Sequence, residues 1–188
     1  MYNLPLVLYT ISLSHFLYAF VWIFTPHYKN ITRKMGMIPI NFLIVCSYVL
    51  KGVQFITIAY YLLSLEHFRF NTNERAMILS GGLFTAGQTL NLTVYFKLGN
   101  TGVYYGNRLG YDTVWVTSFP YNYLDNPQYI GSVLSILSML FIIPIFETFV
   151  IVCFWIGCYM MTSICENNYR ITRIIYKECA MIKNKIEK

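Results

Sequence analysis

Residues 129–164 read YIGSVLSILSMLFIIPIFETFVIVCFWIGCYMMTSI, and this apolar run decides the fold. A helix rises about 1.5 Å per residue, so a hydrocarbon core about 30 Å thick needs only about 20 residues. The run is 36 residues long, and Pro144 interrupts it. Because proline breaks or kinks a helix, the run predicts either a helical hairpin that enters the membrane and returns, or one long kinked helix that forms a fourth span.

Three further apolar stretches precede this run, at about residues 5–24, 37–63 and 76–96. Hydrophobic residues make up 56% of the chain and charged residues only 12%, and the mean hydropathy is +0.49. A soluble domain of this length is less apolar. We therefore predict an all-α polytopic membrane bundle that forms one domain over residues 1–188, with three spans plus the hairpin or fourth span.

The placement of charge favours the hairpin over the single kinked helix. The chain has a formal net charge of +6, and Lys29, Arg33 and Lys34 follow the first span. The tail, residues 165–188, carries six more cations: Arg170, Arg173, Lys177, Lys183, Lys185 and Lys188. Positively charged connections stay in the cytosol, and only a hairpin at Pro144 puts both basic clusters on one side. Isoleucines at roughly helical spacing further predict an amphipathic helix in the tail, lying on the cytosolic leaflet.

The connection over residues 99–128 is the longest stretch without helical periodicity. Loops of this length are usually functional or disordered. Its many tyrosines, together with Trp115, argue for a folded segment at the membrane interface, where these side chains are favoured. The five cysteines show no paired spacing and no histidine partner, so the sequence indicates neither a disulfide framework nor a metal site.

Polar residues inside the predicted spans are candidate functional groups, because they are costly in lipid. They are His15, Lys51, Gln54, Gln88, Asn91 and Glu147. Each also has a structural interpretation: Lys51 and Glu147 could reach a membrane surface or lie near a turn, and Gln88 and Asn91 could tie helices together. The small residues of the third span, Gly81, Gly82, Ala86 and Gly87, suit close helix packing or a ligand that approaches the backbone.

The densest polar motif lies in residues 118–132, which read SFPYNYLDNPQYIGS. This segment resembles the signature loop of the phospholipid N-methyltransferases, whose pattern is close to F-P-[FY]-N-x-L-D-N-P-x-Y-x-G-S. Upstream, GQTLNL at residues 87–92 and YFKLGNTGVYYG at residues 95–106 resemble the third span and following loop of that family. Glu166 falls where the family begins an acidic motif.

The resemblance implies transfer of methyl groups from S-adenosylmethionine to the amine of an ethanolamine phospholipid in the bilayer, ending in phosphatidylcholine. Phosphatidylethanolamine and its mono- and dimethylated forms are all candidate acceptors, and we favour the methylated ones. By resemblance, the cofactor-binding positions are Thr85, Ala86 and Gly87 in the third span, and Glu166 with Asn167 after the last. Here threonine replaces a family glycine, and Asn167 replaces a second glutamate.

The chemistry of methyl transfer suits the same residues. A sulfonium cation is attracted to aromatic faces by about 0.5–2 kcal/mol each, and Phe119, Tyr121, Tyr123 and Tyr129 are the candidates. The acceptor amine must lose a proton before it attacks, and Asp125 is the best-placed carboxylate, with Glu166 sharing that role or binding the cofactor. Asn126 completes the catalytic candidates, and it also suits a turn that caps the next helix.

The resemblance further implies the endoplasmic reticulum membrane, with a mitochondrial membrane as the alternative, and a site facing the cytosol. No nucleic-acid partner is indicated, and the sequence leaves the oligomeric state open. Two other functions remain: an isoprenylcysteine carboxyl methyltransferase, whose related loop favours His-Pro where this chain has Asn126 and Pro127, and a non-catalytic lipid-binding or scaffold protein.

Overall fold

The computed structural model describes residues 3–113 and 116–167. They form seven helices: α1 (Leu4–Ile23), α2 (Thr25–Lys34), α3 (Pro39–Leu63), α4 (Glu74–Val103), α5 (Gly106–Leu109), α6 (Pro127–Ile142) and α7 (Phe146–Asn167). This part of the chain contains no strand. The predicted all-α fold is therefore confirmed.

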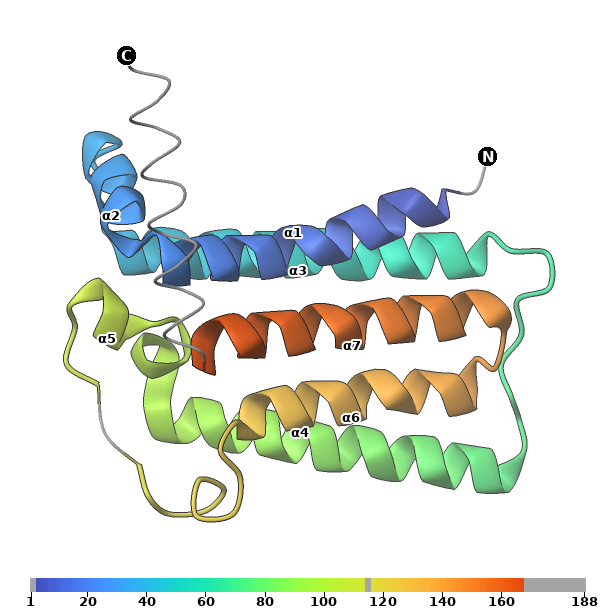
Figure 1. The fold of residues 1–188 in the computed structure, drawn as a ribbon. Coiled ribbons are helices and arrows are strands. Elements are labelled where there is room, and N and C mark those ends of the chain that lie inside the picture. Colours follow the sequence, from blue (N-terminus) through green and yellow to red (C-terminus); the bar gives the residue numbers. More distant parts are fainter. Residues whose placement is uncertain (1–2, 114–115, 168–188) are drawn as a thin grey trace.

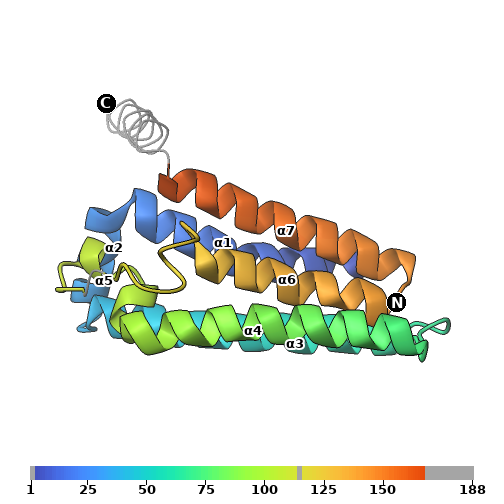
Figure 2. The same cartoon turned by 90° about the horizontal axis from the view of Figure 1, so that it is seen from below.

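The five long helices, α1, α3, α4, α6 and α7, run side by side along one direction (Figure 1). The short helices α2 and α5 lie together at one end, which we call the α5 end, with the connection that leads into α6. The connection over residues 64–73 and the turn between α6 and α7 lie at the other end, which we call the Asn71 end. Figure 2 shows the same separation from a second direction.

Helices α1, α3 and α7 are each long and apolar enough to cross a membrane, and α6 is a shorter apolar helix. Large apolar side chains cover the outside of the bundle, including Phe16 at 73% exposure, Ile56 at 71% and Phe96 at 86%. Water would disfavour such a surface, whereas lipid is its natural solvent. The described residues thus form a helical membrane protein.

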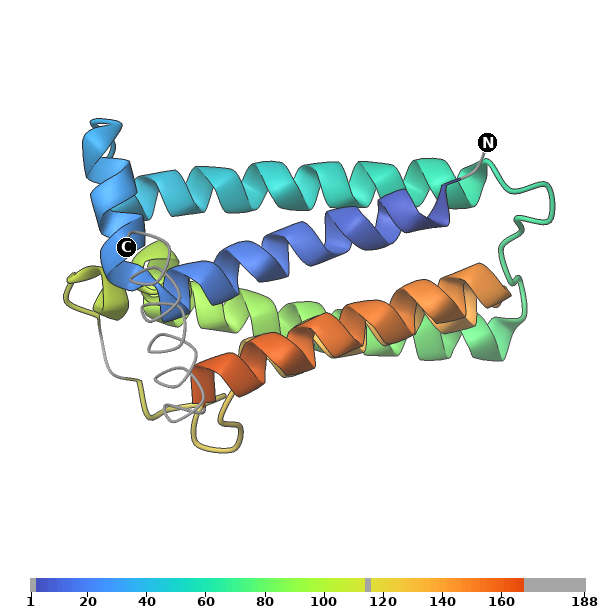
Figure 3. The same cartoon turned by 45° about the horizontal axis from the view of Figure 1, so that its top comes forward.

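The apolar run around Pro144 folds as two helices. Helix α6 ends at Ile142, and α7 begins at Phe146 and returns beside it (Figure 3). Proline has no N–H to continue the helical ladder, which explains the break. The hairpin brings the end of α7 to the α5 end, where α2 carries Lys29, Arg33 and Lys34. The predicted amphipathic helix of the tail lies outside the described residues, except that residues 165–167 belong to α7.

The predicted loop differs from the structure at its start. Helix α4 continues to Val103 and bends at Gly99, whose φ of 60° and ψ of −179° lie outside the helical region. Glycine adopts a positive φ without steric cost, so the chain bends there and does not leave the helix. Tyr104 and Leu109 are then buried with Val21, Tyr28 and Leu43, which packs the segment containing α5 against α1, α2 and α3.

Helices α4 and α6 approach each other through two glycines. A Cβ atom at Gly87 would lie 2.4 Å from the carbonyl oxygen of Gly131 and 2.4 Å from Oγ of Ser135. A Cβ atom at Gly131 would lie 2.6 Å from the carbonyl oxygen of Gly87. Small residues allow helix backbones to meet in this way. The packing interpretation of Gly87 is therefore correct.

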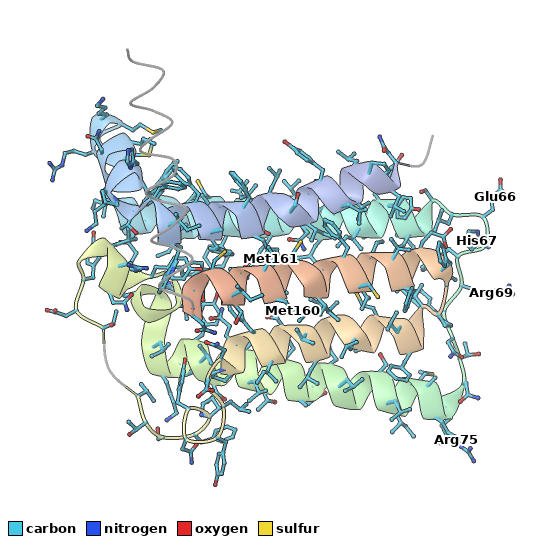
Figure 4. All side chains as sticks on the ribbon, in the orientation of Figure 1. Glu66, His67, Arg69, Arg75, Met160 and Met161 are labelled. Carbon is cyan, nitrogen blue, oxygen red and sulfur yellow. The ribbon has the colours of Figure 1, made fainter. Side chains whose placement is uncertain are left out.

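Polar contacts fix the Asn71 end. The backbone N–H of Asn71 donates to the carbonyl of Ile142 at 2.8 Å, and its side-chain Nδ2 donates to the carbonyl of Phe141 at 3.1 Å. The Asn73 side chain accepts from the N–H groups of Arg75 and Ala76 and thereby caps α4. Figure 4 shows polar and charged side chains of this end, Glu66, His67, Arg69 and Arg75, far from Met160 and Met161 on α7.

Glu147 also lies near this turn, as one of its two interpretations predicts. Its Oε2 is 3.0 Å from Nε2 of His67.

Candidate functional site

A cavity of about 250 Å³ opens at the α5 end. Aromatic side chains from α1, α6, α7 and the connection around α5 form much of its lining: Tyr18, Trp22, Tyr104, Tyr105, Tyr121, Tyr129 and Tyr159. Two carboxylates, Asp125 and Glu166, join them. We call this space the aromatic cavity. Its lining combines ring faces and these two carboxylates with one lysine, Lys51; the ring faces and the carboxylates attract a cationic group.

Glu166 connects the elements around the aromatic cavity. It lies in the last turn of α7, and its Oε1 accepts hydrogen bonds from the phenols of Tyr105 and Tyr129. Tyr105 comes from the connection between α4 and α5, and Tyr129 from the first turn of α6. Within the described residues, Oε2 of Glu166 has no hydrogen-bond partner. As far as the described residues go, this second oxygen is left to bind a ligand.

Several neighbouring side chains hold Tyr105 in place. Its backbone has a φ of 58°, a left-handed conformation that is uncommon outside glycine. Its ring packs on Tyr18 with the centroids 6.0 Å apart, and on Trp22 with the centroids 5.2 Å apart. Arg108 in turn covers Trp22, with its guanidinium carbon 3.9 Å from the ring centroid. Unusual backbone conformations held by such packing are frequent at functional sites.

Burial raises the pKa of the Tyr105 phenol well above its usual value, and the neighbouring Tyr129 and Glu166 raise it further. The phenol therefore stays protonated at neutral pH. It remains a hydrogen-bond donor to Glu166, which keeps that carboxylate in one orientation.

The four predicted catalytic residues, Asp125, Asn126, Tyr129 and Glu166, all line the aromatic cavity. Asp125 is exposed. Asn126 occupies the cap position of α6, as predicted, although its side chain makes no capping bond; its backbone carbonyl accepts from the N–H of Tyr129 at 3.1 Å. The structure thus brings these residues together, and their catalytic roles remain predictions.

The predicted cofactor-binding residues are divided between two places. Glu166 lines the aromatic cavity, and the adjacent Asn167 is exposed and donates from Nδ2 to Oγ of Ser163 at 3.2 Å. Thr85 and Ala86 lie on the exposed face of α4, in a shallow groove that also contains Phe119. Gly87 is buried against α6. In the part of the chain that the structure describes, Thr85, Ala86 and Gly87 are therefore not among the residues that line the aromatic cavity.

A second cavity of about 280 Å³ lies deeper in the bundle. Five of the six polar residues predicted inside the spans line it: His15, Lys51, Gln54, Gln88 and Asn91. We call it the polar cavity. It shares five lining residues with the aromatic cavity, namely His15, Tyr18, Lys51, Gln128 and Tyr159. The two spaces are neighbours with a common wall.

Hydrogen bonds hold several of these polar groups. Nδ1 of His15 is 3.1 Å from Oγ1 of Thr162. Nε2 of Gln88 donates to Oγ of Ser135 at 2.9 Å, so Gln88 does tie α4 to α6. Among the described residues, no group of three or more histidine, cysteine or acidic side chains could hold a metal ion.

The apolar helical exterior is that of a helical membrane protein, and a cavity lined by aromatic and acidic side chains opens at one end of its bundle. The family model for phospholipid methyltransferases matches residues 75–178. This match covers more than half of the chain, and the chain belongs to that family.

Individual relatives match a shorter region. The phosphatidyl-N-methylethanolamine N-methyltransferase of Arabidopsis thaliana is 47% identical over 62 residues, which cover 33% of this chain and 38% of the relative. The protein of the same name from Saccharomyces cerevisiae is 44% identical over 69 residues, or 36% of this chain and 34% of the relative. The phosphatidylethanolamine N-methyltransferase A of Dictyostelium discoideum is 42% identical over 62 residues, or 32% and 29%. The chain thus spans about a third of the length of these relatives, and no solved structure matches it.

Proposed function

We propose that this chain transfers methyl groups from S-adenosylmethionine to the amine of phosphatidylethanolamine that already carries one or two methyl groups, and so produces phosphatidylcholine. The observation that supports it most is the aromatic cavity, where Glu166 is held by two phenols and surrounded by rings. The family membership supports the reaction type. The names of the Arabidopsis and yeast relatives favour the methylated acceptors.

The lining of the aromatic cavity fits the cofactor chemically. Each ring face attracts a cation by about 0.5–2 kcal/mol, and Tyr105, Tyr129 and Tyr159 offer several within one space. Oε2 of Glu166, which has no partner among residues 3–113 and 116–167, suits an ammonium or hydroxyl donor of the cofactor. S-adenosylmethionine supplies an activated methyl group on a sulfonium, so that the new N–C bond forms as the S–C bond breaks and a neutral thioether leaves.

The protein's own residues have three tasks in this reaction. Asp125, exposed at the mouth of the cavity, accepts the proton that the substrate ammonium loses and returns it to water. Glu166 and the surrounding rings hold positive charge in a fixed place. Buried Tyr104 and half-buried Tyr105 close one side of the cavity and limit the access of water to the reacting nitrogen. Alignment of amine, methyl carbon and sulfur then supplies much of the rate.

We further propose that the α5 end faces the cytosol. Lys29, Arg33 and Lys34 of α2 lie at this end, and positively charged connections remain cytosolic. On the family resemblance, we propose that the protein resides in the endoplasmic reticulum membrane.

The direct test is an assay of purified membranes with radiolabelled S-adenosylmethionine and three acceptors: phosphatidylethanolamine and its mono- and dimethylated forms. We expect label in extractable phospholipid, with the methylated acceptors preferred. Glu166→Gln keeps the shape of the side chain but removes its charge, and should reduce the rate at least about tenfold, as expected for loss of a charged hydrogen-bond acceptor. Glu66→Gln, at the Asn71 end, is the matched control and should retain full activity.

Absence of label with all three acceptors would refute the proposed reaction. Normal turnover of Glu166→Gln would be compatible with the proposed reaction but would refute the proposed role of Glu166 in it.

A further inference from the structure

Lys51 carries a cation into the interior of the bundle. It lies near the middle of α3, which spans Pro39–Leu63, and it lines both the aromatic and the polar cavity. Within residues 3–113 and 116–167, its ammonium makes no hydrogen bond or ion pair. Ionisable groups at membrane depth are costly and usually pair with a partner or a ligand. An anion that enters the cavity would supply a partner that Lys51 does not find among the described residues.

Gln54 places a second hydrogen-bond donor without a partner near Lys51 among the described residues. It follows Lys51 by three residues on one face of α3, is 2% exposed, and lines the polar cavity. Its Oε1 accepts from Oγ of Ser14 at 3.3 Å, whereas its Nε2 is buried without a partner. A buried donor left without an acceptor is destabilising. An incoming oxygen atom would satisfy it.

The two cavities differ in charge. Among the described residues, the polar cavity has Lys51, Gln54 and His15 in its lining and no aspartate or glutamate. The aromatic cavity shares Lys51 and His15 and adds Asp125 and Glu166. Lys51 lies in the common wall, so an anion bound to it on the polar side would lie next to a cation bound by the carboxylates on the aromatic side. A glycerophospholipid with an ethanolamine headgroup has this arrangement, since two carbons separate its phosphodiester from its amine.

The polar cavity also has an apolar side that suits acyl chains. Phe55 of α3 and Phe84 of α4 line it and are 58% and 52% exposed on the outside of the bundle. Met139 and Trp155 line it further inside. A lipid whose headgroup lies between the two cavities would leave its tails on this side, in contact with the bilayer.

From these observations we propose that the polar cavity is the phosphate subsite of the acceptor phospholipid, with the Lys51 ammonium and Gln54 Nε2 binding its phosphodiester oxygens. This inference rests on the proposed function. An alternative anion at Lys51 is the carboxylate of S-adenosylmethionine, and the experiment must separate the two.

The experiment compares Lys51→Met with Lys51→Arg and with Lys34→Met, a matched change on the exposed face of α2. The Michaelis constants for dimethylated phosphatidylethanolamine and for S-adenosylmethionine are measured for each variant. We expect Lys51→Met to raise the constant for the lipid about tenfold or more, as for loss of a charge-assisted hydrogen bond, with the constant for the cofactor unchanged. Lys51→Arg should recover most of the affinity for the lipid, and Lys34→Met should equal the wild type.

A binding measurement gives a second readout that does not require turnover. Trp155 lies in the wall of the polar cavity and Trp22 in that of the aromatic cavity, so the tryptophan fluorescence should change on titration with the dimethylated lipid. Lys51→Met and Gln54→Leu should both weaken this binding. If Lys51→Met fails to fold, Gln54→Leu still tests whether the polar cavity binds the phosphate.

A larger constant for the cofactor with an unchanged constant for the lipid would overturn the proposal and assign Lys51 to the cofactor carboxylate. Unchanged constants for both would overturn it outright. If the wild type methylates no phospholipid, the proposed function itself fails; if the wild type is active and both variants bind lipid normally, only the phosphate subsite is refuted.

Discussion

Gly87→Ala should destabilise the bundle by separating α4 from α6. The added Cβ would lie 2.4 Å from the carbonyl oxygen of Gly131 and 2.9 Å from the backbone nitrogen of Ser135. Real Cβ atoms do not approach backbone this closely, so the helices must move apart. Overpacking of this kind costs about 1–3 kcal/mol.

Gly82→Ala is the matched control, because it lies in the same helix and a Cβ there meets nothing within 4 Å. Both variants gain the same preference of alanine for helix, about 1 kcal/mol, so the difference between them isolates the clash. For a protein of this size, 1 kcal/mol corresponds to roughly 2–4 °C in melting temperature. We therefore expect Gly87→Ala to melt roughly 2–12 °C below Gly82→Ala.

The assay is thermal unfolding in detergent micelles, followed by circular dichroism, together with titration of S-adenosylmethionine. Equal melting temperatures for the two variants would refute the packing argument. If Gly87→Ala melted like the control but lost cofactor affinity, Gly87 would instead act as the ligand position that the sequence resemblance predicts.

Three further outcomes are expected. Tyr129→Phe removes one of the two phenol donors to Glu166 and should lower the methylation rate about tenfold or more, measured at saturating substrates; an unchanged rate would show that one phenol suffices. Asn73→Ala removes the cap of α4 and should cost about 1 kcal/mol of unfolding free energy, which a melting curve would detect. The raised pKa of Tyr105 means that the folded state holds the phenol proton more tightly than the unfolded state does. The contribution of this proton to the free energy of unfolding is therefore complete below about pH 10 and is lost as the pH rises further. Stability should fall above about pH 10, and less steeply in Tyr105→Phe; identical pH profiles would contradict this.

The fold could be predicted from sequence in its main features because each feature had a local cause. Length and apolarity marked α1 and α3, and Pro144 marked the hairpin. The predicted third span lies in α4, which is not one of the three described helices apolar enough to cross a membrane. The end of α4 was predicted too early, since Gly99 bends the helix without ending it. Glycine permits both outcomes, and only the packing of Tyr104 decides between them.

The candidate site was predicted less completely. The motif around Asp125 and Tyr129 was visible in sequence, as was Glu166. The contribution of Tyr18 and Trp22 was not, because aromatic residues in a span resemble ordinary lipid-facing side chains until the fold places Tyr105 beside them. Lys51 was noted as a costly intramembrane cation, but its relation to Gln54 and to two adjoining cavities required the assembled bundle.

The hydrogen bonds of Asn71 also bear on the order in which the protein is made. The carbonyls of Phe141 and Ile142 at the end of α6 need donors, since a bare carbonyl in lipid is costly and Pro144 has no N–H. Their donor is synthesised about 70 residues earlier, which is roughly 4–14 s at about 5–20 residues per second. The ribosome therefore releases the hairpin into a membrane where its cap is already present, and assembly can follow the direction of translation.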